Sequence, residues 1–180
     1  MITVISGSNR KNSECLGFSK RIASGILRHT DTELRLLALE QISHGWFFPE
    51  MYDKGGQHPD LIDIQDVYIL PAEKFIFVFP EYNGTFPGSL KLFIDAVSAR
   101  LYKDNFKNKK VGMVGISSGR AGNIRGMDQL TTVMHHLGAL VMPNQLPISR
   151  IHDLMNEAGE VTDQATLEVM DKFIREFVAF

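Results

Sequence analysis

The sequence predicts an α/β fold in which a parallel sheet of five strands carries helices on both faces. The first observation is the continuous apolar run at 75–79, which is typical of a strand buried on both faces under covering helices. The second is a β-branched run at 2–5 that leads through a small polar loop into helical periodicity. The third is the regular alternation of strand and helix patterns, which implies parallel pairing through right-handed crossovers.

Each element follows from its own pattern of apolar residues. The helix after 75–79, for example, has Leu90, Phe93, Ile94 and Val97 at helical spacing. We expect strands at 2–6, 32–38, 75–79, 111–116 and 139–142. We expect helices near 14–28, 61–70, 88–100, 122–137 and 163–178. The long connection 41–60 contains aromatic residues at 46–48 that can cover a ligand, join a subunit interface or pack locally, and we favour local packing.

The loop at 7–13, Gly-Ser-Asn-Arg-Lys-Asn-Ser, lies between the first predicted strand and helix. Such a loop presents backbone N–H groups and the positive end of a helix to an anion. Ser8 and Ser13 add hydroxyl groups, and Arg10 can bind phosphate through two guanidinium N–H groups. The loop lacks the glycines of a dinucleotide fingerprint and the Gly-Lys of a P-loop, so a terminal phosphomonoester such as that of FMN suits it. The alternative is that Ser13 only caps the helix and Arg10 is a solvated charge.

The segment 80–84, Pro-Glu-Tyr-Asn-Gly, follows the buried strand and precedes an amphipathic helix. Ligands of open α/β sheets bind outside the carboxyl ends of the strands. A planar ring can pack there on the backbone and on Tyr82, and Gly84 allows close approach. Five strands with a phosphate loop after the first favour the strand order 2-1-3-4-5, with the ligand at the switch point between strands one and three.

Two motifs resemble those of the NADPH-dependent FMN reductases: Gly7-Ser8-x-Arg10-x-x-Ser13, and Pro80-Glu81-Tyr82-Asn83-x-x-x-Pro87-Gly88-x-Leu90-Lys91-x-x-Ile94-Asp95. The resemblance extends from Met1 to about Pro143. It implies a flavodoxin-like three-layer sandwich that uses FMN and NADPH, or NADH, and reduces quinones, azo compounds, metal oxyanions or free flavin. It also implies a homodimer or homotetramer, because family members commonly pair through the helices after the third and fourth strands.

The resemblance assigns a role to each loop at the carboxyl edge of the sheet. The FMN phosphate would be held by Ser8, Arg10, Ser13, Glu14 and Cys15. The isoalloxazine ring would be surrounded by Pro80, Glu81, Tyr82, Asn83 and Gly84. Its pyrimidine edge would be touched by Ser117, Ser118, Gly119 and Arg120. The family usually has more glycine where this chain has Ser117-Ser118, and commonly has asparagine at the position of Cys15. Arg120 is also a candidate for the phosphates of the nicotinamide donor, and no side chain is expected to act as nucleophile or general base.

Two other functions are compatible with parts of the sequence. The segment 115–119 matches the serine-hydrolase pattern G-x-S-x-G between a predicted strand and a predicted helix, with Ser117 as nucleophile. Its acid and base would come from Asp128 or Asp153 and from His135, His136 or His152. The other candidate is a flavodoxin-type electron carrier. Such carriers are typically strongly acidic, whereas the net charge of this chain is −2, so a reductase is favoured.

Composition predicts one cytoplasmic domain over residues 1–180. The charge of −2 argues against a nucleic-acid partner, and no apolar stretch approaches the roughly 20 residues of a membrane span. A single cysteine forms no internal disulfide and suits a reducing compartment. We expect no metal site, because the adjacent His135 and His136 face different ways on a helix. The lysine-rich segment 107–110 is expected to be a solvated turn.

Overall fold

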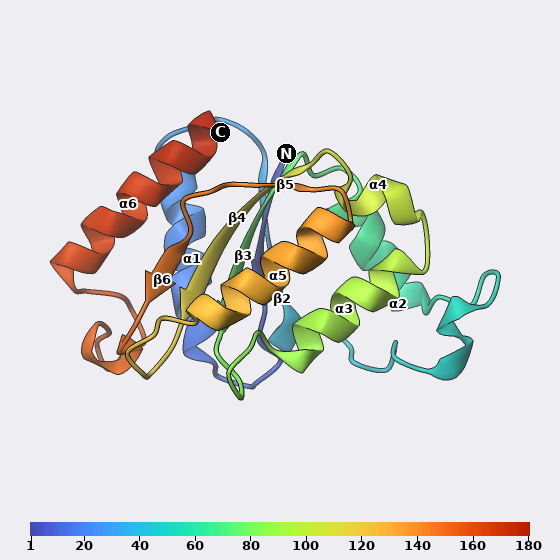
Figure 1. Cartoon of the computed structure of the whole chain (residues 1–180), viewed down its shortest axis with the longest axis horizontal. Helices are drawn as coiled ribbons and strands as arrows, with labels where there is room; N and C mark the ends of the chain where they lie inside the picture. The colour runs from blue at the N-terminus through green and yellow to red at the C-terminus, as the bar shows by residue number, and fades with distance from the viewer.

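The structure, a computed structural model, describes residues 1–180 and contains one parallel sheet with strand order β2-β1-β3-β4-β5 (Figure 1). This order confirms the predicted arrangement. A sixth strand, β6, also pairs with β4, so the expected count of five strands is one short. The strands are β1 Ile2–Ser6, β2 Leu34–Ala38, β3 Lys74–Pro80, β4 Lys110–Ile116, β5 Leu140–Val141 and β6 Leu146–Ile148.

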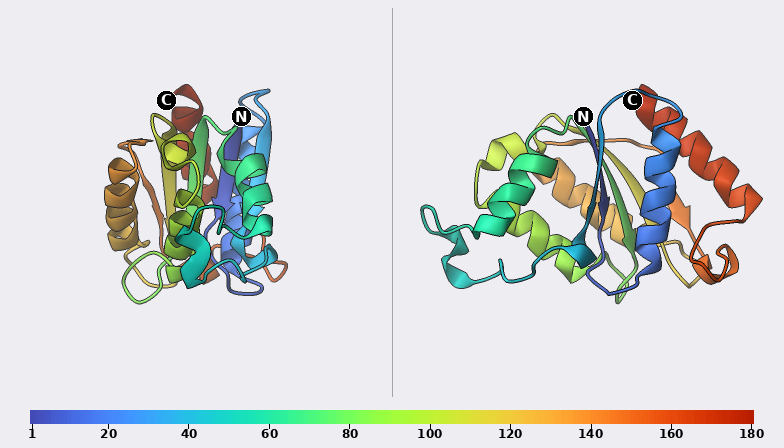
Figure 2. Two further views of the ribbon diagram at one scale, coloured as in Figure 1. Left: turned by 90° about the vertical axis from the view of Figure 1, so that its right-hand side faces the viewer. Right: turned by 180° about the vertical axis from the view of Figure 1, so that it is seen from behind.

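Helices cover both faces of the sheet and complete three layers (Figure 2). The α-helices are α1 Glu14–Ile26, α2 Pro59–Ile64, α3 Gly88–Ser98, α4 Tyr102–Phe106, α5 Ile124–His136 and α6 Gln164–Ala179. Four further helical turns, which are not α-helical, are η1 Leu39–Gln41, η2 Pro49–Tyr52, η3 Gln65–Ile69 and η4 Ile151–Asp153. No helix is both long and apolar enough to cross a membrane.

The central strand β3 separates two hydrophobic cores. Phe75, Phe77 and Phe79 point into the core under α3, α4 and α5. Ile76 and Val78 point into the opposite core, which α1 and α6 cover. All five side chains are fully buried, as the continuous apolar run predicted. Burial of each such side chain stabilises the fold by about 1.5–3 kcal/mol, so this strand fixes the centre of the sheet.

The strand expected at 139–142 is shortened to β5 in the structure, and β6, which was not expected, follows it. β5 pairs with β4 at Lys110 and Val111, and β6 continues along the same side of β4 from Val114 to Ile116. Pro143 lies in the break and has no backbone N–H to donate to the ladder. The chain therefore leaves β4 after β5 and rejoins it three residues beyond Pro143.

The helix expected at 61–70 begins earlier and changes its hydrogen-bond pattern. Pro59 occupies its first turn and His58 Nδ1 accepts from the amide of Asp60 at 3.2 Å, so α2 begins at Pro59. From Gln65 the segment is a π-helical turn, η3. The buried Gln65 side chain there donates to the carbonyl oxygens of Val97 and Arg100 at 3.0 and 2.8 Å. The five-residue helix α4, which was not expected, follows α3.

Lys109 is a correction to the expected solvated turn. Its Nζ donates to the carbonyl oxygens of Ile69 and Leu70 at 2.8 and 2.9 Å, at the end of η3, and lies 5.7 Å from the centre of the Phe75 ring. Burial lowers the pKa of this amine from 10.5 to about 8, against an opposing contribution from Asp104. Lys109 therefore joins the sheet to the end of a helix rather than extending into solvent.

The connection 41–60 projects beside α2 and α3 at the right of Figure 1. Trp46 is only 3 % exposed and packs edge-on against Phe93 of α3, with ring centroids 6.1 Å apart. This contact confirms the favoured local packing for Trp46. Phe47 and Tyr52, in contrast, are 55 % and 65 % exposed.

Candidate functional site at the carboxyl edge of the sheet

Three loops lie side by side at the carboxyl edge of the sheet because β1, β3 and β4 are neighbours. They are the β1–α1 loop at 7–13, the β3–α3 loop at 81–87 and the β4–α5 loop at 117–123. The chain leaves β1 toward β2 on one side and reaches β3 on the other. This is the topological switch point, where open α/β sheets bind their ligands.

The β1–α1 loop is shaped to receive an anion. Ser13 caps α1 by accepting from the amide of Cys15 at 3.3 Å, and Ser8 Oγ accepts from the amide of Arg10 at 3.1 Å. Asn12 adopts the left-handed conformation with φ of 58°. The amides of Asn9, Lys11 and Asn12 have no hydrogen-bond partner within the chain. Successive free amides in such a turn form a concave site for phosphate.

Charge and packing around this loop agree with that role. Arg10 and Lys11 are exposed and have no acidic partner within 4 Å. Gly7 holds the loop against the sheet, since a Cβ there would lie 2.9 Å from Leu90 Cδ2 and 3.0 Å from Phe79 Cβ. Packing therefore requires glycine at position 7, the predicted start of the phosphate loop. Two positive side chains remain available at its mouth.

Cys15 differs from the other predicted phosphate residues. Its side chain is fully buried, and Sγ donates to the carbonyl oxygen of Val78 at 3.1 Å. Burial raises the pKa of the thiol from 9.0 to about 11, so it stays protonated at neutral pH. The thiol points into the sheet and away from the loop surface. Only the backbone of Cys15 lies at the expected site, and its amide is already used by Ser13.

The β3–α3 loop makes a tight turn directly after β3. Pro80 ends the strand and Glu81 N donates to Ile116 O at 3.0 Å, which joins the loop to β4. Tyr82 and Thr85 exchange both backbone hydrogen bonds, and the two residues between them have positive φ, 53° for Asn83 and 79° for Gly84. This geometry is a type I′ turn, for which Asn-Gly is the favoured sequence. A Cβ on Gly84 would meet nothing within 4 Å, so the turn leaves open space beside it.

The first two loops are joined directly. The hydroxyl groups of Ser8 and Tyr82 share a hydrogen bond of 2.7 Å, and Ser8 is fully buried. The predicted phosphate loop and the predicted ring loop are thus brought together as one continuous surface. The sequence placed both residues in the site, but their mutual contact was not expected.

The β4–α5 loop is fixed by the strand beside it. Ser117 N donates to Ile148 O at 2.9 Å, and Arg150 N donates to Gly119 O at 3.0 Å. Ser118, Gly119 and Arg120 are exposed, and the amides of Ser118 and Gly119 have no partner within the chain. The loop therefore presents free donors next to the β3–α3 turn.

The serine-hydrolase interpretation finds no support in this geometry. Ser117 is buried, its Oγ donates to Gly119 O at 3.1 Å and accepts from Gly122 N at 3.0 Å. Both partners are backbone groups, and no histidine hydrogen-bonds the hydroxyl. His152 instead lies 4.0 Å from a carboxylate oxygen of Glu14. Ser117 stabilises the turn and lacks the base that activates a serine nucleophile.

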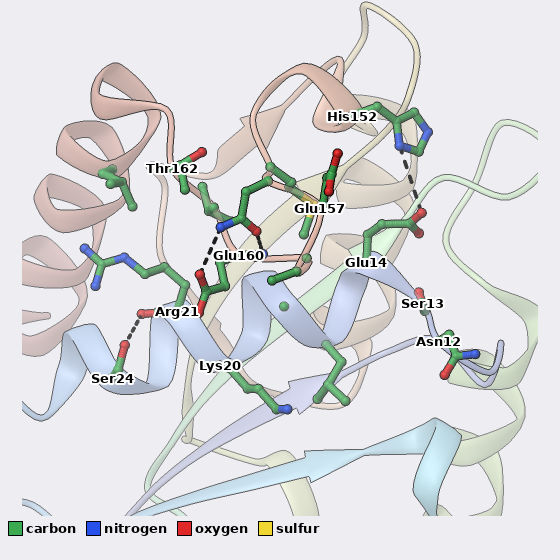
Figure 3. A pocket seen from close by; sticks show the side chains of 18 of the residues that line it. Asn12, Ser13, Glu14, Lys20, Arg21, Ser24, His152, Glu157, Glu160 and Thr162 are labelled. Carbon is green, nitrogen blue, oxygen red and sulfur yellow. Dashed lines mark hydrogen bonds and ion pairs between the residues drawn. The ribbon is translucent and has the colours of Figure 1, made fainter.

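A groove of about 1070 Å³ lies beside the phosphate loop over the outer face of α1, and sequence analysis did not identify it (Figure 3). One wall is a hairpin closed by the Met155–Val161 bridge. The hairpin contacts α1 because Gly17 has no side chain, and a Cβ there would lie 2.6 Å from Gly159 O. The walls of the groove carry both positive and negative side chains, from Lys20, Arg21, Glu157 and Glu160.

The fold is that of a flavodoxin-like protein, and the three loops lie at its switch point, where open α/β sheets bind their ligands. The chain belongs to the family of NADPH-dependent FMN reductases, whose sequence profile matches residues 1–153. It is accordingly an NAD(P)H-dependent oxidoreductase whose cofactors are FMN and NADPH.

Individual relatives agree with this assignment. An NADPH azoreductase from Bacillus sp. (strain OY1-2) is 24 % identical over 161 residues, which cover 88 % of this chain and 82 % of the relative. A quinone reductase from Escherichia coli (strain K12) is 27 % identical over 169 residues, or 93 % of this chain and 87 % of the relative. The solved structure of FerB, a flavoenzyme NAD(P)H:(acceptor) oxidoreductase from Paracoccus denitrificans, superposes with a TM-score of 0.79 at 25 % identity and covers 99 % and 94 % of the two chains.

Proposed function

We propose that the three loops bind FMN across the switch point, with its phosphate in the β1–α1 loop and its ring against the other two loops. The observation that carries this proposal is the Ser8–Tyr82 hydrogen bond of 2.7 Å, which joins a loop of free amides to an open type I′ turn. The donor set fits the chemistry of FMN, because free amides and Arg10 suit a phosphate. The space beside Gly84 suits a flat ring.

The phosphate would be held by Ser8, Arg10, Ser13 and the backbone amide of Glu14, which has no partner within the chain. The amide of Cys15 is already bonded to Ser13 Oγ, so we propose no direct contact for this residue. The ring would lie against Pro80, Glu81, Tyr82, Asn83 and Gly84. Its pyrimidine edge would face Ser117, Ser118, Gly119 and Arg120. Of these groups, the amides of Asn83, Gly84, Ser118 and Gly119 are free within the chain, which supports their use as donors to the ligand.

Bound FMN supplies the redox chemistry, since it takes a hydride from a nicotinamide and passes electrons to an acceptor. The task of this chain is to orient the reactants and to place donors where negative charge develops. The amides at 83–84 and 118–119 have no partner within the chain and would be available to stabilise that charge. Arg120 is exposed at the same edge and is available to the phosphates of NADPH. No side chain is assigned as nucleophile or general base.

The physiological acceptor is proposed to be a small oxidised molecule: a quinone, an azo compound, a metal oxyanion or free flavin. The names of the azoreductase and quinone reductase relatives support this class. A pure electron carrier is disfavoured by the net charge of −2, because docking to redox partners usually relies on strong charge complementarity.

We further propose that residues 1–180 act as one FMN-binding domain of a cytoplasmic homodimer or homotetramer. Leu90 and Phe93 of α3 and Leu130 of α5 are buried in the core and are therefore unavailable to a partner subunit. We therefore place the proposed contact on the outer surface of α3 and α5, which border a cavity of about 450 Å³ lined by Lys91, Asp95, Tyr102 and His136 among others. Light scattering after size exclusion tests this assembly, and a fully active monomer would contradict it.

Titration with flavins tests the proposed site. We expect FMN to bind saturably with one site per chain and FAD to bind more weakly, because the proposed loop suits a terminal phosphomonoester. The measurement is quenching of flavin fluorescence during addition of protein. Absence of FMN binding at high micromolar concentration, or a preference for FAD, would contradict the proposed site.

A further inference from the structure

Glu40 places a carboxylate on the phosphate loop. β1 and β2 pair in register from Ile2–Leu34 to Ser6–Ala38, so residues that follow the two strands emerge side by side. Glu40 lies in the short helix η1, two residues past the end of β2. Its Oε2 accepts from the amide of Ser13 at 3.3 Å, at the entrance to α1. An acidic side chain thus accepts from one of the amides of the proposed phosphate loop.

The position of Glu40 is not explained by an ion pair with a neighbouring cation. Glu40 has no lysine, arginine or histidine nitrogen within 4 Å. The nearby cations of the loop, Arg10 and Lys11, are exposed and equally unpaired. The carboxylate is half-buried and accepts from the backbone of the loop, which places its charge beside the proposed phosphate site.

We propose that Glu40 is a specificity-determining residue that weakens the hold of the loop on the FMN phosphate, so that FMN exchanges with solution instead of remaining permanently bound. The inference rests on the proposed FMN site. A phosphate monoester carries a charge of roughly −1.5 to −2 at neutral pH. A neighbouring carboxylate therefore repels the phosphate of FMN and leaves riboflavin, which lacks that group, unaffected.

The expected size of the effect follows from Coulomb's law. A single negative charge roughly 6 Å from a phosphate of charge about −2 reduces affinity about tenfold at the dielectric constant of water. Partial exclusion of water increases this effect, and salt reduces it. Repulsion at short range raises the FMN off-rate and repulsion at longer range lowers the on-rate, so removal of the Glu40 charge should slow FMN dissociation.

A structural role for Glu40 makes a different prediction. If Glu40 serves only to hold Ser13 in place, replacement by glutamine changes little, because the amide oxygen of glutamine accepts the same hydrogen bond. Glu40→Gln therefore removes the charge and keeps the acceptor. Glu73→Gln is a matched control, since Glu73 is exposed before β3 at the opposite, amino edge of the sheet.

The experiment measures Kd for FMN and for riboflavin, and the FMN off-rate, in the natural chain, Glu40→Gln and Glu73→Gln at low and high salt. We expect Glu40→Gln to bind FMN about tenfold more tightly, with a slower off-rate, unchanged riboflavin affinity and a smaller gain at high salt. Glu73→Gln should match the natural chain.

Two outcomes would overturn the proposal. Unchanged or weaker FMN binding by Glu40→Gln, or equal tightening for FMN and riboflavin, shows that the Glu40 charge does not act on the phosphate while the FMN site itself stands. Failure of the natural chain to bind FMN would instead remove the proposed site and this role of Glu40 together. Thermal melting of each variant confirms that the compared proteins are folded.

Discussion

Arg10 is the residue on which the phosphate assignment depends most directly. It is exposed in the loop between β1 and α1, and no acidic side chain pairs with it. A hydrogen bond to a charged group contributes about 1.5–3 kcal/mol, so Arg10→Ala should weaken FMN binding about ten- to a hundredfold. Riboflavin affinity should change little. Parallel fluorescence titrations with the two ligands provide the measurement.

Lys11→Ala is the matched control for this prediction. It removes the same charge from the adjacent position of the loop but lacks the planar guanidinium that binds phosphate through two N–H groups. We expect a clearly smaller loss of FMN affinity for Lys11→Ala. Equal losses for FMN and riboflavin in Arg10→Ala would show that Arg10 does not contact the phosphate.

At the residue scale, the sequence predicted the site from residue types and spacing but could not predict side-chain direction. Ser8 and Tyr82 were both predicted, yet their hydrogen bond depends on how two distant loops meet. The thiol of Cys15 points into the sheet because its position on α1 faces Val78. Glu40 was missed because it lies outside both motifs. The available signal was its position just past the end of a predicted strand at the ligand edge.

At the scale of elements, the most predictable features were those with long apolar patterns. The run at 75–79 became β3 because every residue in it is buried on one face or the other. The break between β5 and β6 was less predictable. It depends on Pro143 and on which residues of β4 are free to pair with the chain on either side of the break. The helix α4 is five residues long and carries too short a pattern to recognise.

The contact of Lys109 with the end of η3 predicts how the stability of the protein depends on pH. Lys109 has a folded-state pKa of about 8 against 10.5 for the free side chain. Between these values the unfolded chain binds more protons, so this group makes the free energy of unfolding rise with pH. Lys109→Met removes that dependence and leaves the carbonyl oxygens of Ile69 and Leu70 without their donor. The gap in free energy of unfolding between the natural chain and the variant should therefore widen from pH 8 to pH 10.5.

Denaturant unfolding of both proteins at several pH values measures this gap. Subtraction of the two free energies of unfolding cancels the contributions of other groups that titrate in the same range. Lys103→Met is the control, because Lys103 is exposed on α4 and has no ion pair. Its gap to the natural chain should stay constant with pH. A constant or narrowing gap for Lys109→Met would contradict the proposed burial of its amine.

At the scale of the whole molecule, strand order was predictable because few topologies connect five strand–helix units by right-handed crossovers. That order brings the loops after β1, β3 and β4 to one edge, and the family profile matches residues 1–153 around them. The groove over α1 was not predictable, since it forms only when the hairpin at 155–161 closes on Gly17. Contacts between segments so far apart carry no local sequence signal.

The central claim is that this chain uses bound FMN to carry electrons from a nicotinamide to a small acceptor. The most direct measurement is the absorbance of protein-bound FMN in the absence of oxygen, first after NADPH or NADH is added and then after a quinone is added. We expect the absorbance of oxidised flavin to disappear with the nicotinamide and to return with the quinone over repeated cycles. The same additions to free FMN without protein should react far more slowly. Bound FMN that neither nicotinamide reduces would contradict the claim.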